Sequence, residues 1–484
     1  MSDYKFLMES RLSPEQFQVV NQLGRFASAQ GLNLYLVGGA VRDLTSGHQP
    51  IRDLDFVLEG NIQKILRQLE SAGGESKQRG PHAEGAVPHL QVERMRLDPH
   101  LSAAELVFAP GVRSELAMAR AESYSRPGHH PESSPATIFE DLKRRDFSVN
   151  AMAISLHPNS RGLLLDPTNG VADIERRELR ALHSRSFVDD PSRIYRLVRL
   201  GLRLDFKPEE RTQNWLDRAL EAHLVESLTP DQQGYELRGI LQEGNPSRVL
   251  KVLAQRKLLA VLDRKLGSAK INYDRFDKIR SAARSAPDAD TFLLNFHCLT
   301  ERLSPAEKLR LGKKIIKDAK VIKAALGLER EAQRLSRLLA GNKASLPSQV
   351  YHILYGRPLP LLLFLLVHFP QTKIQTRIKT FLVKCPQIRA QLPRAELQSL
   401  GVEPGPKLDK ILERIFLDQL DGKLKTHQQV TKAIRELAGI KEQPPRALKG
   451  EKGKRGKGMP PPTRGINRAV RTRETFGQGR TSIR

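Results

Sequence analysis

Cysteine and aromatic residues are scarce in this chain of 484 residues. It contains two cysteines and one tryptophan, and Phe, Trp and Tyr together make up 5% of the sequence. Cys298 and Cys385 stand far apart without His or Cys neighbours, which argues against a zinc site or a disulfide framework. Leu, Ala and charged residues are abundant instead, and this composition favours a largely helical protein around a modest sheet.

Long apolar runs are also missing. The longest, from Leu361 to Val367, is far too short to span a bilayer. The first ten residues, MSDYKFLMES, lack the apolar core of a signal peptide. We therefore expect a cytoplasmic protein with no membrane partner.

Acidic residues are outnumbered by basic ones. The chain has 54 Asp and Glu against 80 Lys and Arg, a formal net charge of +26. A field of this sign attracts polyanions, so nucleic acid is the favoured partner, although part of the charge is expected to coat a solvated surface. Residues 441–484 contain 13 basic and 3 acidic residues among Gly and Pro. This tail has too few apolar groups for a core and is expected to be disordered.

The order of elements predicts an α+β fold. Short β-prone runs at 33–39, 54–58, 89–96, 105–108 and 115–120 predict a mixed sheet of about five strands, and helical periodicity dominates from Phe139 onward. A chain of this length is expected to form two or three domains. We expect a leading helix over 1–30, a catalytic head over 31–156, a helical neck over 157–245, a helical body over 246–440 and the basic tail.

Two aspartates on one expected strand are the first candidates for chemistry. Asp53 and Asp55 flank Leu54, and side chains two apart on a strand share a face, so both can bind the same pair of metal ions. Hard carboxylate oxygens hold the ions that nucleotidyl transfer requires. The triplet alone is a weak signal, since composition produces about five or six acid-x-acid triplets in such a chain.

The segment LVGGAVRD, upstream of Asp53, supplies the context. Gly38 and Gly39 would let backbone amides approach a triphosphate, and Arg42 adds positive charge one helical turn later. A lone Gly-Gly turn is usually only a turn. Here the turn, the arginine and the acidic strand come in the order that a phosphate cradle beside a metal site requires.

These segments and three later ones resemble the class II tRNA nucleotidyltransferase (CCA-adding enzyme) and bacterial poly(A) polymerase family. LVGGAVRD followed by RDLDFVLEG resembles the head domain, and SELAMARAESYSRPGHHP is similar to the strand of the third carboxylate, here Glu115. DLKRRDFSVNAMAISL resembles the RRDFTxNAM motif and contains Arg145. LLLDPTNGVADIERRELRAL is similar to the hairpin and helix start that follow, and SFVDDPSRIYRLVRLGLRLDF resembles the nucleotide-selecting neck motif. The resemblance covers residues 34 to 206 in family order.

The neck motif reads Glu-Asp-x-x-Arg in that family. This sequence matches it at Asp190 and Arg193, with Asp189 where Glu is usual. A carboxylate accepts a hydrogen bond from the exocyclic amino group of cytosine or adenine, which uracil and guanine replace with a carbonyl. The resemblance also implies that Arg196 and Arg199 help to hold the triphosphate or shape the pocket. The alternative is that these arginines coat a helix or pair with Asp189.

The resemblance implies catalysis by two metal ions. An RNA 3′ hydroxyl attacks the α-phosphate of ATP or CTP and pyrophosphate leaves, with Mg²⁺ as the cofactor. The helical body and the basic tail would bind the RNA backbone. The implied catalytic residues are Asp53, Asp55 and Glu115, of which Asp53 and Asp55 bind the metal, and the implied nucleotide-binding residues are Gly38, Gly39, Arg42, Arg145, Asp190, Arg193, Arg196 and Arg199.

Three functions stay open at this point. The first is addition of CCA, or of part of it, to tRNA; the second is a poly(A) polymerase; the third is a non-catalytic RNA-binding protein that has kept the fold. HAEGAV, at 82–87, stands where a His-x-x-Phe-Gly-Thr-like turn is expected, which leaves the nucleotide choice open. The length of the product and the oligomeric state are open as well.

Overall fold

The computed structural model describes residues 3–48, 50–76, 91–98, 102–126, 128–129, 131–286 and 289–439. The strands are β1 (Asn33–Val37), β2 (Leu54–Glu59), β3 (Val92–Asp98), β4 (Ala103–Phe108), β5 (Val112–Met118), β6 (Arg120–Ser123), β7 (Glu132–Pro135), β8 (Ala153–Ser155), β9 (Leu164–Leu165), β10 (Glu178–Leu179) and β11 (Lys207–Pro208). The helices of the head and neck are α1 (Tyr4–Arg11), α2 (Pro14–Ala29), α3 (Gly39–Ser46), α4 (Gln63–Ser76), α5 (Ile138–Lys143), α6 (Gly170–Arg176), α7 (Ser186–Asp189), α8 (Arg193–Leu204), α9 (Glu210–Glu221) and α10 (Pro230–Leu241).

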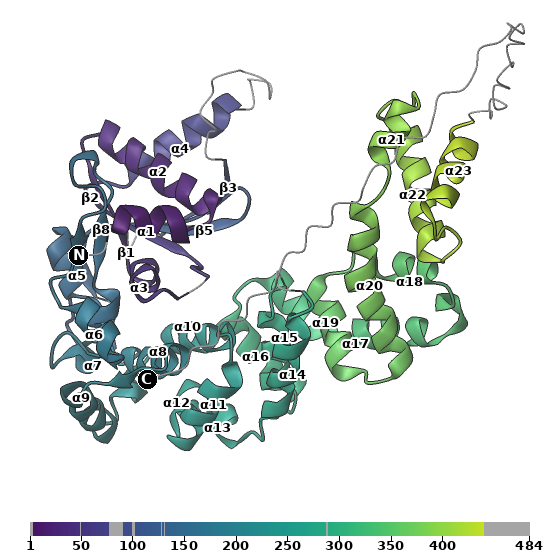
Figure 1. The fold of residues 1–484 in the computed structure, drawn as a ribbon. Coiled ribbons are helices and arrows are strands. Elements are labelled where there is room, and N and C mark those ends of the chain that lie inside the picture. Colours follow the sequence, from purple (N-terminus) through teal and green to yellow (C-terminus); the bar gives the residue numbers. More distant parts are fainter. Residues whose placement is uncertain are drawn as a thin grey trace, which may run out of the picture.

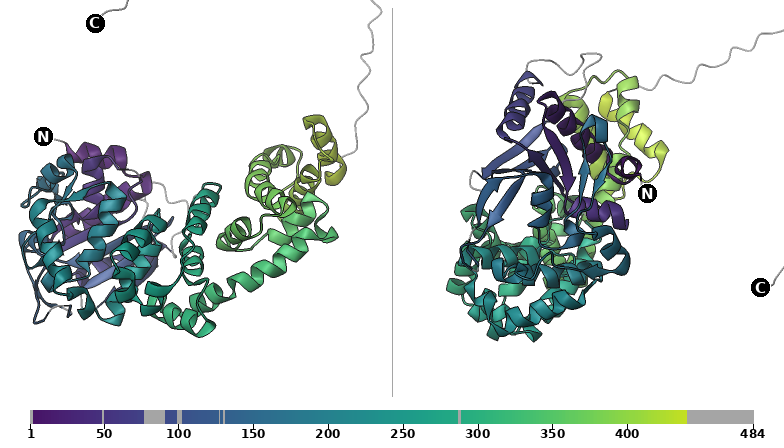
Figure 2. Two further views of the ribbon diagram at one scale, coloured as in Figure 1. Left: turned by 90° about the horizontal axis from the view of Figure 1, so that it is seen from below. Right: turned by 90° about the vertical axis from the view of Figure 1, so that its left-hand side faces the viewer.

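The rest of the described chain is helical. Figure 1 shows these helices leading away from the sheet to a separate group formed by the last three, and the left view of Figure 2 shows the same extended arrangement from below. They are α11 (Pro246–Gln255), α12 (Leu258–Leu262), α13 (Arg264–Ser268), α14 (Tyr273–Ala283), α15 (Phe292–Thr300), α16 (Pro305–Ile315), α17 (Ala319–Ala340), α18 (Pro347–Leu354), α19 (Leu359–His368), α20 (Thr372–Ala390), α21 (Arg394–Ser399), α22 (Pro406–Leu420) and α23 (His427–Ala438).

The head is built on one mixed sheet of seven strands in the order β3-β4-β5-β2-β1-β8-β9. β2 and β5 are parallel, and the other neighbours in this sheet are antiparallel. The α+β fold class is confirmed, and the sheet has two strands more than the predicted five. The additional strands, β8 and β9, have three and two residues, which is too short for an alternating pattern to reveal.

The two faces of β2 have different surroundings. Leu54, Phe56 and Leu58 belong to the main core, which also contains residues of α2 and α4. Val57 faces the other way and packs in a smaller cluster with residues of α5. Because the side-chain period of a strand is two, Asp55 and Asp53 share the face of Val57 rather than the core face. The alternation of the strand therefore turns both carboxylates away from the main core.

The leading segment forms two helices, α1 and α2, rather than one continuous helix. The chain breaks before Ser13, whose hydroxyl oxygen accepts a hydrogen bond from the Gln16 backbone N–H and completes a capping box, with Pro14 in the first turn. Arg11 of α1 donates to the Leu44 carbonyl at 2.5 Å. This contact caps the end of α3, the helix that follows the glycine turn.

The last three helices have a hydrophobic core of their own. Leu397, Leu408, Ile415 and Ile434 are among its buried residues. Within the described residues no single helix is long and apolar enough to cross a membrane. Together α18 and α19 are long and apolar enough, but a bend of 119° separates the two helices. The segment 82–87 and the tail 441–484, on which two predictions fall, lie outside the described residues.

Candidate active site

Two predicted carboxylates lie opposite each other on neighbouring strands, and a third stands just before one of these strands. Asp55 is directly opposite Glu115 in the parallel pairing of β2 with β5. Asp53 immediately precedes β2 and shares the face of Asp55. The register of this parallel pair makes two residues that are 60 positions apart in the sequence neighbours in the middle of the sheet.

Burial and neighbouring negative charge raise the pKa of two of these carboxylates, Asp55 and Glu115. Burial raises the pKa of Asp55 to about 7, and Glu115 and Asp53 add to this rise while Arg145 and Arg42 oppose it. The pKa of Glu115 is also raised, mainly because the surrounding protein restricts its hydration, with Arg120 opposing and Glu105 adding to the shift. Negative charge concentrated in this way is relieved by a cation.

The glycine turn lies directly against Asp55. Gly38 has φ +67° and ψ −132°, a backbone conformation that L side chains rarely adopt. A Cβ atom at Gly38 would stand 3.3 Å from Asp55 Oδ2 and 3.3 Å from Arg145 Nη1. At Gly39 the nearest atom to such a Cβ would be Arg42 Nη2, at 3.5 Å. The missing side chains therefore leave a space bordered by a carboxylate and two guanidinium groups.

Hydrogen bonds to neighbouring residues hold in place the two arginines that border this space. Arg42 is 4% exposed and donates to Asn150 Oδ1 at 2.7 Å and to Asp43 Oδ1 at 2.9 Å. Arg145 donates to Asp141 Oδ2 at 3.0 Å and to the Asn150 carbonyl at 3.5 Å. Both predicted phosphate-binding arginines therefore have fixed positions beside the glycine turn.

Asp141 is a residue that the sequence analysis missed. It is fully buried, and its carboxylate accepts hydrogen bonds from Arg144 Nη2 at 2.6 Å and from Arg145 Nη2 at 3.0 Å. Burial favours a higher pKa for Asp141, but Arg145 and Arg144 outweigh it and the pKa is lowered. Its position three and four residues before two arginines at a helix end was the available signal.

Asp190 and Arg193, the predicted base-selecting pair of the neck, lie next to Arg144. Arg193 is 3% exposed and donates to Ser186 Oγ and to the Arg144 carbonyl, each at 2.8 Å. Its Nε has no hydrogen-bond partner within the described part of the chain, although Asp190 Oδ2 lies 3.7 Å away. Burial favours a higher pKa for Asp190, but Arg196 and Arg193 outweigh it and the pKa is lowered. Asp190 is therefore held as a carboxylate.

Arg196 and Arg199 have different partners. Arg196 donates to Asp190 Oδ2 at 3.2 Å and lies 3.4 Å from Glu236 Oε1. Arg199 donates to Glu236 Oε2 at 3.1 Å and to Glu243 Oε1 at 3.0 Å, so its charge is balanced by two buried glutamates. Both glutamates lie about forty residues away along the chain, and no local pattern indicated them. Arg199 therefore supports Arg196 indirectly, because both arginines contact Glu236.

Asp189 does not engage the neck arginines. Its carboxylate accepts from Arg185 Nη2 at 3.1 Å and lies 4.0 Å from His183 Nδ1. Among the described residues, the ion pairs of Arg193 and Arg196 include Asp190 instead. The alternative in which the neck arginines pair with Asp189 is therefore not the arrangement that forms.

Asp53 and Asp55 could bind a metal ion whose other ligands are water and the phosphates of a bound substrate. Among the described residues, no three His, Cys, Asp or Glu side chains converge closely enough to enclose an ion by themselves. Mg²⁺ is commonly bound through one or two carboxylates, water and substrate phosphates rather than by a protein cage. Asp53 and Asp55 beside the glycine turn match that pattern.

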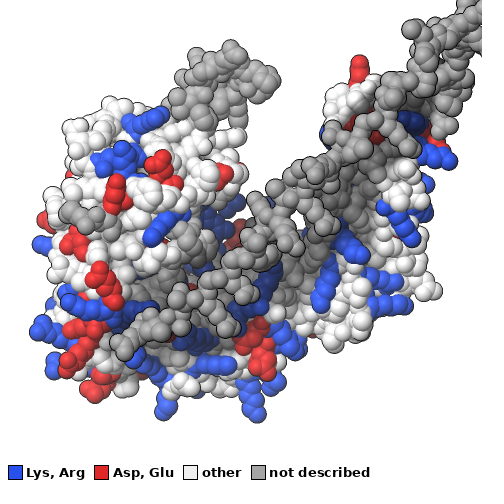
Figure 3. All heavy atoms as spheres, in the orientation of Figure 1, with Lys and Arg blue, Asp and Glu red and all other residues white. Residues whose placement is uncertain are grey.

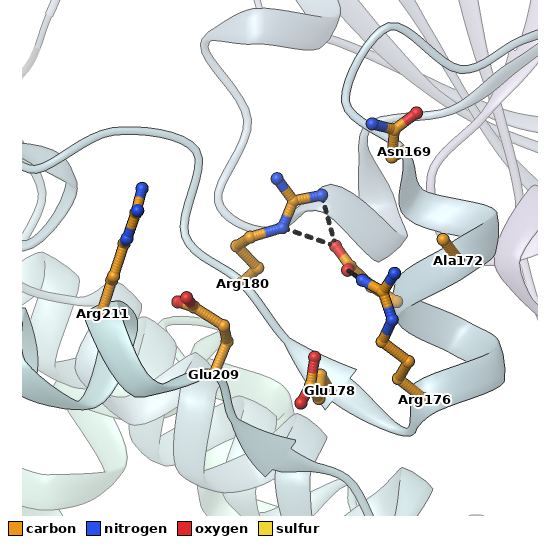
Figure 4. Close-up of a pocket in the computed structure, with 8 residues that line it drawn as sticks. Asn169, Ala172, Arg176, Glu178, Arg180, Glu209 and Arg211 are labelled. Carbon is orange, nitrogen blue, oxygen red and sulfur yellow. Dashed lines mark hydrogen bonds and ion pairs between the residues drawn. The ribbon is translucent and has the colours of Figure 1, made fainter.

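A separate cavity of about 300 Å³ lies away from these groups (Figure 4). Its lining includes Asp173, Arg176, Arg180, Glu209 and Arg211 from α6, α9 and the segment between them. Arg180 Nη2 is 2.7 Å from Asp173 Oδ2, so the cavity's most buried carboxylate is already paired. It contains none of the predicted site residues.

Comparison with known sequences shows which proteins the chain is similar to. Residues 34–180 match the poly A polymerase head domain family. An A-adding tRNA nucleotidyltransferase of Halalkalibacterium halodurans is 37% identical over 244 residues, 50% of this chain and 52% of that protein. A CC-adding tRNA nucleotidyltransferase of Deinococcus radiodurans is 35% identical over 244 residues, 50% of this chain and 59% of that protein. The chain spans about half the length of the curated relatives it matches.

A solved structure extends the likeness beyond the head. A CCA-adding enzyme in its apo form II is 26% identical, with a TM-score of 0.50, and the comparison covers 90% of this chain and 99% of that one. The sheet, the neck and the helices that follow therefore share an overall arrangement with that protein.

Proposed function

We propose, from the premise that residues 34–180 belong to the poly A polymerase head domain family, that this chain is a template-independent RNA nucleotidyltransferase acting on tRNA 3′ ends. It would add CMP, AMP or both from CTP and ATP. The observation that carries the proposal is the pairing of Asp55 with Glu115 directly beside the open Gly38 turn. The names of the A-adding and CC-adding relatives support tRNA as the substrate.

Each part of the site has a task in this reaction. The triphosphate would lie over Gly38 and Gly39, where the backbone is open, with its charge neutralised by Arg42 and Arg145. Bound Mg²⁺ would neutralise the charge that develops on the attacking and leaving oxygens. Asp53 and Asp55 would hold it, and Glu115 would orient the RNA 3′ hydroxyl beside the α-phosphate.

The neck would select the base. Asp190 is kept ionised by its arginines and would accept a hydrogen bond from the exocyclic amino group of cytosine or adenine. Arg193 Nε makes no hydrogen bond with the described residues and would donate to the adjacent ring nitrogen or carbonyl. Uracil and guanine present a carbonyl where Asp190 requires a donor, so they would be rejected.

The helical body would hold the RNA. Residues 319–390, which span α17 to α20, contain twelve Lys and Arg but two Asp and Glu. Figure 3 shows blue side chains along this part of the molecule. Because phosphate contacts supply affinity without sequence preference, this surface suits an RNA backbone. A cytoplasmic location would follow from tRNA as the substrate.

The test uses tRNA transcripts that end before the first C, after CC, or in full CCA, each with ATP, CTP, UTP or GTP. We expect CMP or AMP to be added and extension to stop at or before CCA. Asp55→Asn should lower incorporation by at least about 100-fold, since it weakens the metal site. Glu93→Gln, which changes an exposed carboxylate on the edge strand β3, is the matched control and should keep activity.

The other outcomes decide between the remaining functions. A long A tract on any RNA would assign poly(A) polymerase activity instead. Equal, negligible incorporation by the wild type and Asp55→Asn, together with RNA binding, would leave the non-catalytic RNA-binding function.

A further inference from the structure

Arg196 of α8 stands among three carboxylates. Its Nη2 donates to Asp190 Oδ2 at 3.2 Å, its Nε lies 3.4 Å from Glu236 Oε1, and its Nη1 lies 3.9 Å from Asp146 Oδ2. A guanidinium group presents its nitrogens in one fixed plane, so contacts on three nitrogens set both the position and the orientation of the group. Three separate segments of the chain therefore hold this arginine in place.

The same contacts fix Asp190, the base-selecting carboxylate. Asp190 Oδ2 accepts from Arg196, while Asp190 Oδ1 accepts from Ser192 Oγ at 2.5 Å and from the Ser192 backbone N–H at 3.1 Å. Ser192 Oγ also accepts from Arg196 Nη2 at 3.0 Å. Both oxygens of Asp190 are thus bound, and the direction in which the carboxylate can accept a further hydrogen bond from a base depends on Arg196.

Asp146 connects this group to the head. Its Oδ1 accepts from Asn150 Nδ2 at 3.1 Å, while its Oδ2 is the oxygen that lies near Arg196. Asn150 Oδ1 in turn accepts from Arg42 Nη1 at 2.7 Å. A continuous series of contacts therefore runs from the phosphate cradle at the glycine turn to the base-selecting carboxylate of the neck.

The charges around Arg196 disfavour a direct contact with the triphosphate. Three carboxylates lie 3.2 to 3.9 Å from its nitrogens. A triphosphate has the same sign of charge as these carboxylates, so its approach to Arg196 would be opposed at short range. Arg42 and Arg145, by contrast, border the open space at the glycine turn. They are the better placed phosphate ligands.

We propose that Arg196 is a positioning residue that fixes Asp190 for base selection and connects it to the phosphate cradle, without binding the triphosphate itself. The inference rests on the proposed function and adds to it a link between two subsites. The family resemblance implied that Arg196 either holds the triphosphate or shapes the pocket, and the contacts support the second role. Through this link, a disturbance of the cradle would reach the base-selecting carboxylate.

The preference between nucleotides isolates this role, because CTP and UTP, like ATP and GTP, have the same ribose and triphosphate. Arg196→Lys keeps the charge but loses the planar group, so the preference in kcat/KM for CTP over UTP, or for ATP over GTP, should fall by about 10-fold or more. Arg310→Lys is the matched control. Arg310 donates to Asp263 at 2.6 and 3.2 Å outside the candidate site, and its substitution should leave the preference unchanged.

Inorganic triphosphate, which has no base, tests whether Arg196 binds phosphate. In the presence of Mg²⁺, its Kd should stay within about 2-fold of the wild-type value in Arg196→Lys and should rise by roughly 10-fold in Arg42→Lys. An equal rise in both variants would make Arg196 a phosphate ligand and would overturn the proposal.

A double-mutant cycle tests the connection through Asp146. Asn150→Ala disturbs the cradle side of the series, yet it should lower the base preference by roughly 3- to 10-fold if the connection exists. The Asn150→Ala/Arg196→Lys variant should show no lower preference than Arg196→Lys alone, because both substitutions break the same connection. Losses of preference that multiply would show that the two residues act independently, and the connection would be refuted.

Equilibrium binding of the four nucleotides to the full chain keeps this result independent of turnover. Failure of the wild type to incorporate any nucleotide would overturn the proposed function. A base preference in the wild-type Kd values that Arg196→Lys abolishes would still support the positioning role. An unchanged preference in Arg196→Lys would overturn that role, and so would a wild type that shows no base preference in either measurement.

Discussion

Substituting Gly38 with Ala tests the phosphate cradle in isolation. The backbone at φ +67° and ψ −132° is strained for any L residue, and such strain costs of the order of 1–3 kcal/mol. The added methyl group would stand 3.3 Å from both Asp55 Oδ2 and Arg145 Nη1, closer than ordinary contacts, so each must move by a few tenths of an ångström. It would also occupy the space in which we place the triphosphate.

The two effects have different magnitudes and different readouts. The strain should lower the midpoint of thermal unfolding by about 2–4 °C for each kcal/mol in a domain of this size. The displacement of Asp55 and Arg145 by a few tenths of an ångström, together with the loss of space for the triphosphate, should lower kcat/KM by roughly 10- to 100-fold, since a shift of about 1 Å can cost about 100-fold. Single-turnover incorporation with saturating RNA measures the chemical step, and calorimetry measures stability.

Gly31→Ala provides the matched control. Gly31 has φ +64°, and no atom lies within 4 Å of a Cβ placed there. The variant should show a similar loss of stability but keep kcat/KM within about 2-fold, because the site is untouched. If Gly38→Ala and Gly31→Ala lost activity equally, the loss would come from backbone strain, and the cradle would be refuted. Full activity in Gly38→Ala would refute it as well.

Three further outcomes follow from the structure. Asp141→Ala should lower the free energy of unfolding, measured in urea, by about 3–5 kcal/mol, because the substitution removes the buried partner of two guanidinium groups. A loss below about 1 kcal/mol would contradict this reasoning. Arg193→Lys keeps the positive charge but loses the planar guanidinium group, which donates two hydrogen bonds from separate nitrogens. Misincorporation of UTP relative to CTP should therefore rise by about 10-fold or more. Unchanged selectivity would show that Arg193 does not take part in base selection. Burial lowers the pKa of His297 to about 3 and of His368 to about 4, so the unfolded chain binds protons first as the pH falls below about 6.5. Stability that is complete above that pH should decrease by on the order of 2 kcal/mol for each of the two histidines at pH 5. The His297→Gln/His368→Gln variant should show a flatter dependence of the unfolding midpoint on pH, and an equal slope would contradict the assignment.

Local patterns predicted the parts of the site that are close in sequence. The glycine turn, Arg42 and the two aspartates lie within 18 residues, and alternation on a strand was enough to place Asp53 and Asp55 on one face. Glu115 came only from the family resemblance, because strand pairing across 60 residues leaves no periodic signal. The strand order of the sheet was unpredictable for the same reason.

The supporting residues were harder to find. Asp141 sits at helical spacing from Arg144 and Arg145, but the same spacing occurs in many solvated ion pairs, and only burial makes it informative. Glu236 and Glu243 act on arginines of a different helix.

The parallel pairing of β2 with β5 has a consequence for biosynthesis. Asp55 leaves the ribosome well before Glu115, and the connection between their strands must be complete before they can pair. Closing a loop of that length costs entropy before any contact is gained, so this pairing should form late in folding. A nascent chain would thus carry both aspartates for a period without a working centre.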